Sequence, residues 1–102
     1  MSDNEMWAAG FLSGIGSFFL RNSKGIKAVT LTIKSRSHPE AVQRFAQIAG
    51  TNCIMSDAGM KVTLSGKPLH AFLKRLWDEL PVERKKEYAA LRKAATPDPW
   101  EH

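Results

Sequence analysis

The feature that most constrains the fold is the charge-free stretch Met6–Phe19, which contains three closely spaced glycines. Gly10 and Gly14 are four residues apart, so on a helix they share a face on which a second helix can approach closely. Gly16 is placed to end this helix, and residues 17–20 are typical of a strand. The stretch predicts a helix with one smooth face that leads straight into a strand.

The same helix carries a second row, which consists of large apolar side chains. Trp7, Phe11 and Ile15 recur at four-residue spacing and are expected to pack on a core. The stretch is too short to span a bilayer, and Asp3 and Glu5 precede it where a signal peptide needs positive charge. We therefore expect a cytoplasmic protein with no membrane partner.

The composition fits one domain with an unusual distribution of charge. The chain has 102 residues, a net charge of +5 and one cysteine. Cys53 lies in an apolar strand-like run, which favours a buried thiol in a reducing compartment. Residues 21–36 carry five basic side chains and no acidic one. Such a block indicates a polyanion partner, although a solvated basic surface is the alternative interpretation.

Hydrophobic periodicity predicts an α+β fold. Between residues 26 and 34, Val29, Leu31 and Ile33 alternate with more polar residues, which is the pattern of a half-buried strand. The predicted elements are a disordered leader 1–5, a helix 6–15, a hairpin 18–34, a helix ending at Gly50, a hairpin 53–65, a helix from 67 to 80, an extra charged helix 82–95 and a tail 96–102. We expect an antiparallel four-stranded sheet with helices on one face, within a single domain 6–95.

The glycine-rich segment resembles the signature nonapeptide of the LAGLIDADG homing endonucleases, with the residues Ala8-Ala9-Gly10-Phe11-Leu12-Ser13-Gly14-Ile15-Gly16 followed by Ser17-Phe18. The order α-β-β-α-β-β-α also resembles one half of that family. Residues 67–73 are similar to the segment that opens the family's helix after the second hairpin. The resemblance implies that two copies of the motif helix pack at a twofold axis, with the outer sheet face lying in the major groove of DNA.

The metal-binding part of the motif is absent. In the family, the acidic residue before the last glycine holds a divalent metal, and here that position is Ile15. The earlier acidic position of the motif is Ser13, which offers only a neutral hydroxyl. Because magnesium needs carboxylate or phosphate oxygens, we expect no nuclease activity, no metal and no cofactor. Asp57 is assigned to a hairpin turn, and no histidine has a partner suited to catalysis.

Strand alternation assigns the residues that would contact DNA. Short hydroxyls and long cationic donors suit base edges and phosphates. Phe19 either contacts a thymine methyl or is simply exposed, and a bulge near Gly59 or Gly66 would reverse the second hairpin. The predicted DNA-binding residues are Ser17, Phe19, Arg21, Ser23, Lys24, Thr30, Thr32, Lys34, Arg36, Lys61, Thr63 and Ser65, with Lys85 and Lys86 at backbone phosphates near the axis.

A single-motif chain would find its partner helix in a second copy. The predicted dimer interface consists of Trp7, Gly10, Phe11, Ser13 and Gly14. The leading hypothesis is a catalytically inactive homodimer that binds specific, palindromic or near-palindromic double-stranded DNA as a nucleoid-associated transcriptional regulator, with no small-molecule substrate. The alternatives are an endonuclease with displaced acidic ligands, a maturase acting on intron RNA, and a protein-interaction module that uses the glycine face.

Overall fold

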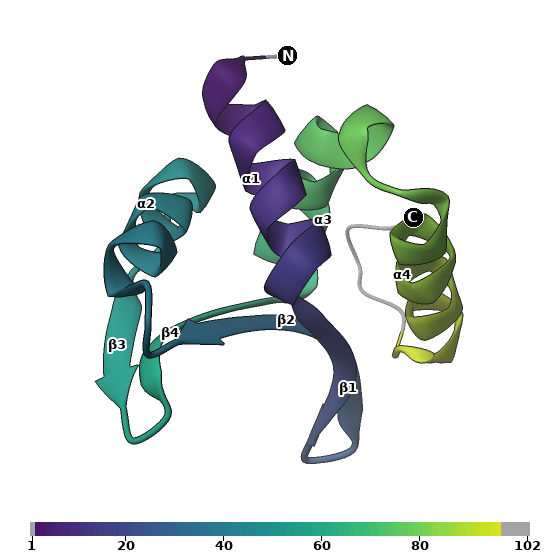
Figure 1. Ribbon diagram of the computed structural model, residues 1–102. Helices are drawn as coiled ribbons and strands as arrows, with labels where there is room; N and C mark the ends of the chain where they lie inside the picture. Colours follow the sequence, from purple (N-terminus) through teal and green to yellow (C-terminus); the bar gives the residue numbers. More distant parts are fainter. Residues whose placement is uncertain (1, 97–102) are drawn as a thin grey trace.

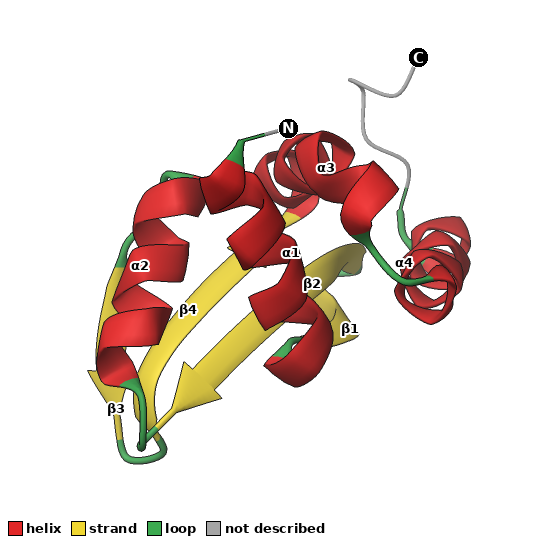
Figure 2. Cartoon of the chain, turned by 45° about the horizontal axis from the view of Figure 1, so that its top comes forward, coloured by secondary structure: helices red, strands yellow, loops and turns green. Residues whose placement is uncertain are grey.

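A computed structural model describes residues 2–96 of the chain, which form the predicted α+β fold. The elements are, in order, α1 (Asp3–Ile15), β1 (Ser17–Ser23), β2 (Ile26–Ser35), α2 (Pro39–Ala49), β3 (Cys53–Ser56), β4 (Gly59–Ser65), α3 (Gly66–Leu76), a 3₁₀ turn η1 (Trp77–Glu79) and α4 (Val82–Ala94). The sheet is antiparallel with the order β1-β2-β4-β3. Helices α1, α2 and α3 cover one face of this sheet (Figure 2), and α4 stands beside β1 (Figure 1).

The first helix begins earlier than the sequence analysis predicted. Ser2 and Glu5 form a capping box, in which Glu5 N donates to Ser2 Oγ at 3.2 Å and Ser2 N donates to Glu5 Oε1 at 3.1 Å. These bonds satisfy amides that would otherwise lack partners at the helix start. Glu5 also accepts a hydrogen bond from Arg75 Nε of α3 at 2.8 Å. The prediction of a disordered leader over residues 1–5 is therefore wrong for residues 2–5.

The core lies between the sheet and the helix layer, as the alternation in β2 predicts. Val29, Leu31 and Ile33 are buried on the inner face, where Leu31 is flanked by Phe18 of β1 and Leu64 of β4. The helices contribute the rest of the core, including Leu12, Val42, Phe45, Leu69, Phe72, Leu73 and Leu76. Phe45 and Phe72 meet edge to face, with ring centroids 5.5 Å apart.

The junction between α1 and β1 depends on a glycine. A Cβ atom at Gly16 would lie 2.5 Å from Leu12 Cδ1 and 2.6 Å from the Leu12 carbonyl oxygen. The Gly16 amide also donates to that carbonyl at 2.8 Å and closes the helix. The chain can therefore turn directly from the helix into the sheet only because this position has no side chain.

The fourth helix docks through few residues. Tyr88 is its only buried residue, and the ring packs on Phe18 and Trp77 at centroid distances of 5.7 and 6.1 Å. After the helix, Thr96 N donates to the Lys27 carbonyl at 2.8 Å, and Thr96 Oγ1 accepts from Lys27 N at 2.9 Å. The predicted tail therefore begins with a residue that is fixed to β2, and positions 97–102 lie outside the described residues. None of the helices in residues 2–96 is both long and apolar enough to cross a membrane.

Candidate functional site

The face of the sheet that points away from the helices carries a band of polar and basic side chains. The sheet bends so that the tips of both hairpins point away from the helix layer, which leaves this outer face concave (Figure 1). The strand register places neighbouring side chains in rows across it, namely Ser17–Thr32–Thr63, Phe19–Thr30–Ser65 and Lys34–Lys61. No bulge at Gly59 or Gly66 reverses the side-chain directions in β4. Lys61, Thr63 and Ser65 face outward as predicted, and Val62 and Leu64 are buried.

The outer face is hollowed where the end of α1 reaches it. This sheet-face hollow has a volume of about 410 Å³ and is lined by Ile15, Ser17, Phe19, Thr32, Lys34 and Lys61. Five of these six residues belong to the predicted DNA-binding set, and the sixth, Ile15, is at the motif position of the metal ligand. Folding thus brings the two predicted sets together at one place.

The side chains that line the hollow are suited to an anionic group that is attached to an apolar one. Lys34 and Lys61 are direct partners across β2 and β4, so two ammonium groups share one rim. Ser17 and Thr32 add hydroxyl donors, and no carboxylate lines the hollow. Charge-assisted hydrogen bonds from such donors are the usual way in which proteins hold phosphate groups.

Ile15 contradicts one expectation. It does not continue the core row of Trp7 and Phe11, because its side chain is 44% exposed at the last residue of α1, beside the hollow. An isoleucine offers no electron pair to a metal ion. Within residues 2–96, no group of three or more His, Cys, Asp or Glu side chains is placed to hold a metal.

Thr30 is on the predicted face but is not exposed. It sits in the central part of β2 between Phe19 of β1 and Ser65 of β4, and its exposed fraction is 0%. The large Phe19 ring flanks this short side chain on one side and Ser65 flanks it on the other, within a concave surface. The expectation that Thr30 is available to DNA is therefore wrong for this conformation.

The remaining residues of the predicted DNA-binding set occupy three separate places. Arg21, Ser23 and Lys24 are exposed along the first hairpin, whose Lys24–Gly25 turn has positive φ angles of 53° and 82°. Arg36 donates to the Asp57 carbonyl oxygen at the tip of the second hairpin. Lys85 and Lys86 lie on α4, which stands beside β1, and neither lines the sheet-face hollow (Figure 1).

Helix α1 separates its predicted interface residues into two groups. Trp7 stacks on Phe11 with centroids 4.9 Å apart, and Phe11 packs on Phe45 of α2, so both aromatic rings are engaged within the chain. Gly10 and Gly14 are exposed, and a Cβ atom built on either meets nothing within 4 Å.

Ser13, the remaining predicted interface residue, is partly buried. Its hydroxyl donates to the Ala9 carbonyl at 2.6 Å, and its own carbonyl accepts from Arg84 Nη2 of α4 at 3.1 Å. Of the five predicted interface residues, the two glycines alone are fully open.

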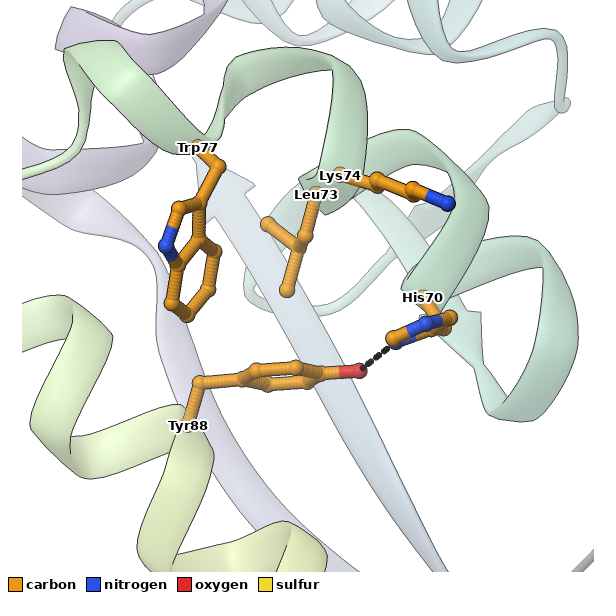
Figure 3. Close-up of a pocket in the computed structure, with 5 residues that line it drawn as sticks. All are labelled: His70, Leu73, Lys74, Trp77 and Tyr88. Atoms are coloured by element: carbon orange, nitrogen blue, oxygen red, sulfur yellow. Dashed lines mark hydrogen bonds between the residues drawn. The ribbon is translucent and has the colours of Figure 1, made fainter. Parts of the chain in front are cut away.

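A second pocket was not anticipated. It lies between α3 and α4 and is lined by His70, Leu73, Lys74, Trp77 and Tyr88 (Figure 3). The sequence gives no periodic signal that joins Trp77 to Tyr88, because they belong to different elements separated by Pro81.

The chain was compared with models of known protein families and with curated proteins. No family model matches it, and no curated protein matches it in sequence.

Proposed function

We propose that this chain is a catalytically inactive, LAGLIDADG-type homodimer that binds specific double-stranded DNA and acts as a transcriptional regulator. The observation that carries the proposal is the sheet-face hollow. Its basic and hydroxyl side chains lie on a concave face, and the end of the glycine-bearing helix reaches the same place. A twofold axis along that helix would set two such faces side by side on a palindromic or near-palindromic duplex.

The glycines of α1 support self-association. Glycine inside a helix costs about 1 kcal/mol relative to alanine, and nothing in the chain's own packing requires it at Gly10 or Gly14. The same side of the helix exposes Met6, which is 49% accessible. A second copy of α1 laid on this face would account for both the missing side chains and the exposed apolar surface.

The donor set argues against phosphodiester cleavage at this site. Magnesium is held through carboxylates and phosphate oxygens, whereas the hollow presents two ammonium groups and an aliphatic side chain. Lys34 and Lys61 would instead neutralise backbone phosphates directly. Binding in this arrangement does not require a divalent ion.

Selection from a random pool of DNA duplexes, carried out in magnesium buffer, tests the proposal as a whole. We expect a twofold-symmetric consensus that is recovered uncut. Nicked products would favour the endonuclease alternative, and preferential recovery of structured RNA in a parallel selection would favour the maturase. Enrichment of nothing beyond salt-sensitive general affinity would favour the protein-interaction module.

Charge-removing variants test the hollow itself. Lys34→Gln and Lys61→Gln should each weaken DNA binding and reduce the slope of log K against log salt by about 1. The matched control is Lys93→Gln, because Lys93 is exposed on α4 and does not line the hollow. Equal effects of all three variants would mean that net charge alone governs binding and that the hollow has no special role.

A further inference from the structure

The sheet-face hollow contains two large apolar side chains that are open to solvent. Ile15 is 44% exposed and Phe19 is 41% exposed, and both line the hollow. The hollow measures about 410 Å³. A sphere of this volume has a radius of about 5 Å, so a group at the centre of the hollow is within reach of every lining side chain. The apolar surface indicates a ligand that has an apolar group beside its anionic one.

The polar side chains of the hollow do not by themselves select one base. Ser17 and Thr32 are partners across β1 and β2, and a hydroxyl both donates and accepts hydrogen bonds. Each hydroxyl can therefore accept from the exocyclic amine of cytosine or donate to the carbonyl of thymine. Lys34 and Lys61 are donors only and are suited to phosphates, which are present at every sequence. Selection between bases is left to the apolar side chains.

One base substituent in the major groove is apolar, and it is the 5-methyl group of a pyrimidine. Thymine carries this group, and 5-methylcytosine carries it at the same ring position. Uracil and unmodified cytosine differ from these bases by the methyl group alone. An exposed aliphatic or aromatic side chain gains contact area when a methyl group packs on it, and loses that contact when the methyl group is removed.

We infer that the sheet-face hollow recognises the 5-methyl group of a pyrimidine in DNA, with Ile15 and Phe19 as the residues that contact it. The inference rests on the proposed function and adds the chemical feature that the hollow selects. The lysines hold the neighbouring phosphates and add affinity at every sequence. Ile15 stands at the motif position of the metal ligand, so the end of α1 contributes to base recognition in place of metal binding.

The test uses the full chain and a fluorescein-labelled duplex that carries the consensus recovered by selection. At each pyrimidine position a methyl-bearing base is compared with its methyl-free counterpart, thymine with uracil and 5-methylcytosine with cytosine. Fluorescence anisotropy measures the affinities. At one symmetric pair of positions, removal of the methyl group should weaken binding about fourfold in one half-site and about fifteenfold in both.

The two comparisons also distinguish the two bases. An effect of thymine against uracil alone would identify thymine as the recognised base, and an effect of 5-methylcytosine against cytosine alone would identify the modified base. In both cases the methyl group is the recognised feature. Specific binding that no methyl group alters at any position would overturn this inference and leave the proposed DNA binding intact. Absence of specific binding to any duplex would overturn the proposed function, and the inference with it.

Four variants assign the effect to the hollow, and the quantity compared is the ratio of affinities for the methylated and methyl-free duplexes. A general loss of stability or affinity cancels in this ratio. Ile15→Ala and Phe19→Ala should each lower it from about fourfold to about twofold or less. Lys61→Gln should weaken both duplexes equally and leave the ratio unchanged.

The matched control for the apolar variants is Ile54→Ala. Ile54 is opposite Lys61 in the sheet and is 62% exposed, but it does not line the hollow. Its substitution should leave the ratio at its wild-type value. An unaltered ratio in both Ile15→Ala and Phe19→Ala, or an equal fall in Ile54→Ala, would contradict the assignment of the methyl contact to the hollow.

Discussion

Helices α1 and α4 each have 13 residues, but they expose different kinds of side chain to solvent. Helix α4 buries only Tyr88 and exposes a surface of charged side chains, which are hydrated by water. Helix α1 buries Ala8, Ala9 and Leu12. After Asn4 its exposed residues are Met6, Gly10, Gly14 and Ile15, none of which is charged. The charged residues suit the exposed face of α4 to water, whereas the exposed apolar face of α1 is the one that we propose for self-association.

The largest loss of stability is expected at Tyr88, the one buried side chain of α4. Tyr88→Ala should lower the free energy of unfolding by about 3 kcal/mol, because it removes a buried aromatic side chain and leaves a cavity. The ring is 4% exposed and contacts both Phe18 and Trp77. Urea denaturation measures the loss. Amide exchange should show α4 released while α1 stays protected. Uniform loss of protection in both helices would mean that α4 is an integral part of the core rather than a docked helix.

Alanine substitutions at the glycines in α1 and at its C-cap should change the free energy of unfolding in opposite directions. Gly10→Ala and Gly14→Ala should together raise the unfolding free energy of the isolated protomer by about 2 kcal/mol, since their surroundings are empty and alanine favours the helix. Gly16→Ala should lower it by about 2 kcal/mol through overlap with Leu12, although its φ of −73° suits any residue. Urea denaturation over a range of protein concentrations separates the protomer from any dimer.

The same variants test the open face of α1. In sedimentation velocity, Gly10→Ala/Gly14→Ala should reduce self-association even though the protomer is more stable. Gly16→Ala is the control, because it changes packing at a buried position and leaves the open face intact. If the double variant associates like the wild type, the glycine face is not the dimer interface.

The sequence could predict which side chains point to each face of the sheet, because this depends on the local hydrophobic period and on the turns. The alternation of Val29, Leu31 and Ile33 predicted both the inner face of β2 and, through the hairpins, the outward set that forms the hollow. Exposure could not be predicted in the same way, since it depends on neighbours from other strands. Thr30 lies between Phe19 and Ser65 and is fully buried, and Ile15, the last residue of α1, is exposed.

The remaining differences have physical causes too. The start of α1 could have been read from Ser2 and Glu5, whose spacing is that of a capping box. The pocket between α3 and α4 could not be predicted from the sequence, because Trp77 and Tyr88 meet only through the packing of two elements. The resemblance of residues 8–16 to the LAGLIDADG motif guided the assignment of roles and stays a prediction.

A smaller effect is expected at the link between the two helices. Arg84 of α4 donates to the Ser13 carbonyl at the end of α1 at 3.1 Å and to Glu87 Oε1 at 2.9 Å. Arg84→Gln should cost about 1 kcal/mol in urea denaturation, because a partly buried carbonyl loses a charged donor. Glu87→Gln removes the ion pair alone and should cost at most a few tenths of a kcal/mol. Equal costs would place the contribution in the ion pair and not in the contact between helices.

The last effect depends on pH and concerns the start of α1. The hydrogen bond from the Ser2 backbone, followed by that from Arg75, lowers the pKa of Glu5 below its ordinary value of 4.5. The ionised carboxylate therefore stabilises the folded state above that value, and this contribution is lost as the pH falls through the lowered pKa. Glu5→Gln should be less stable than the wild type at neutral pH, and the difference should shrink steadily in acid. The charge on Glu5 would then stabilise the start of α1 and its contact with α3, unlike exposed charges of α4 such as Lys86 and Lys93. A difference that stays constant from neutral pH to below the ordinary pKa of a glutamate would instead assign the effect to side-chain shape.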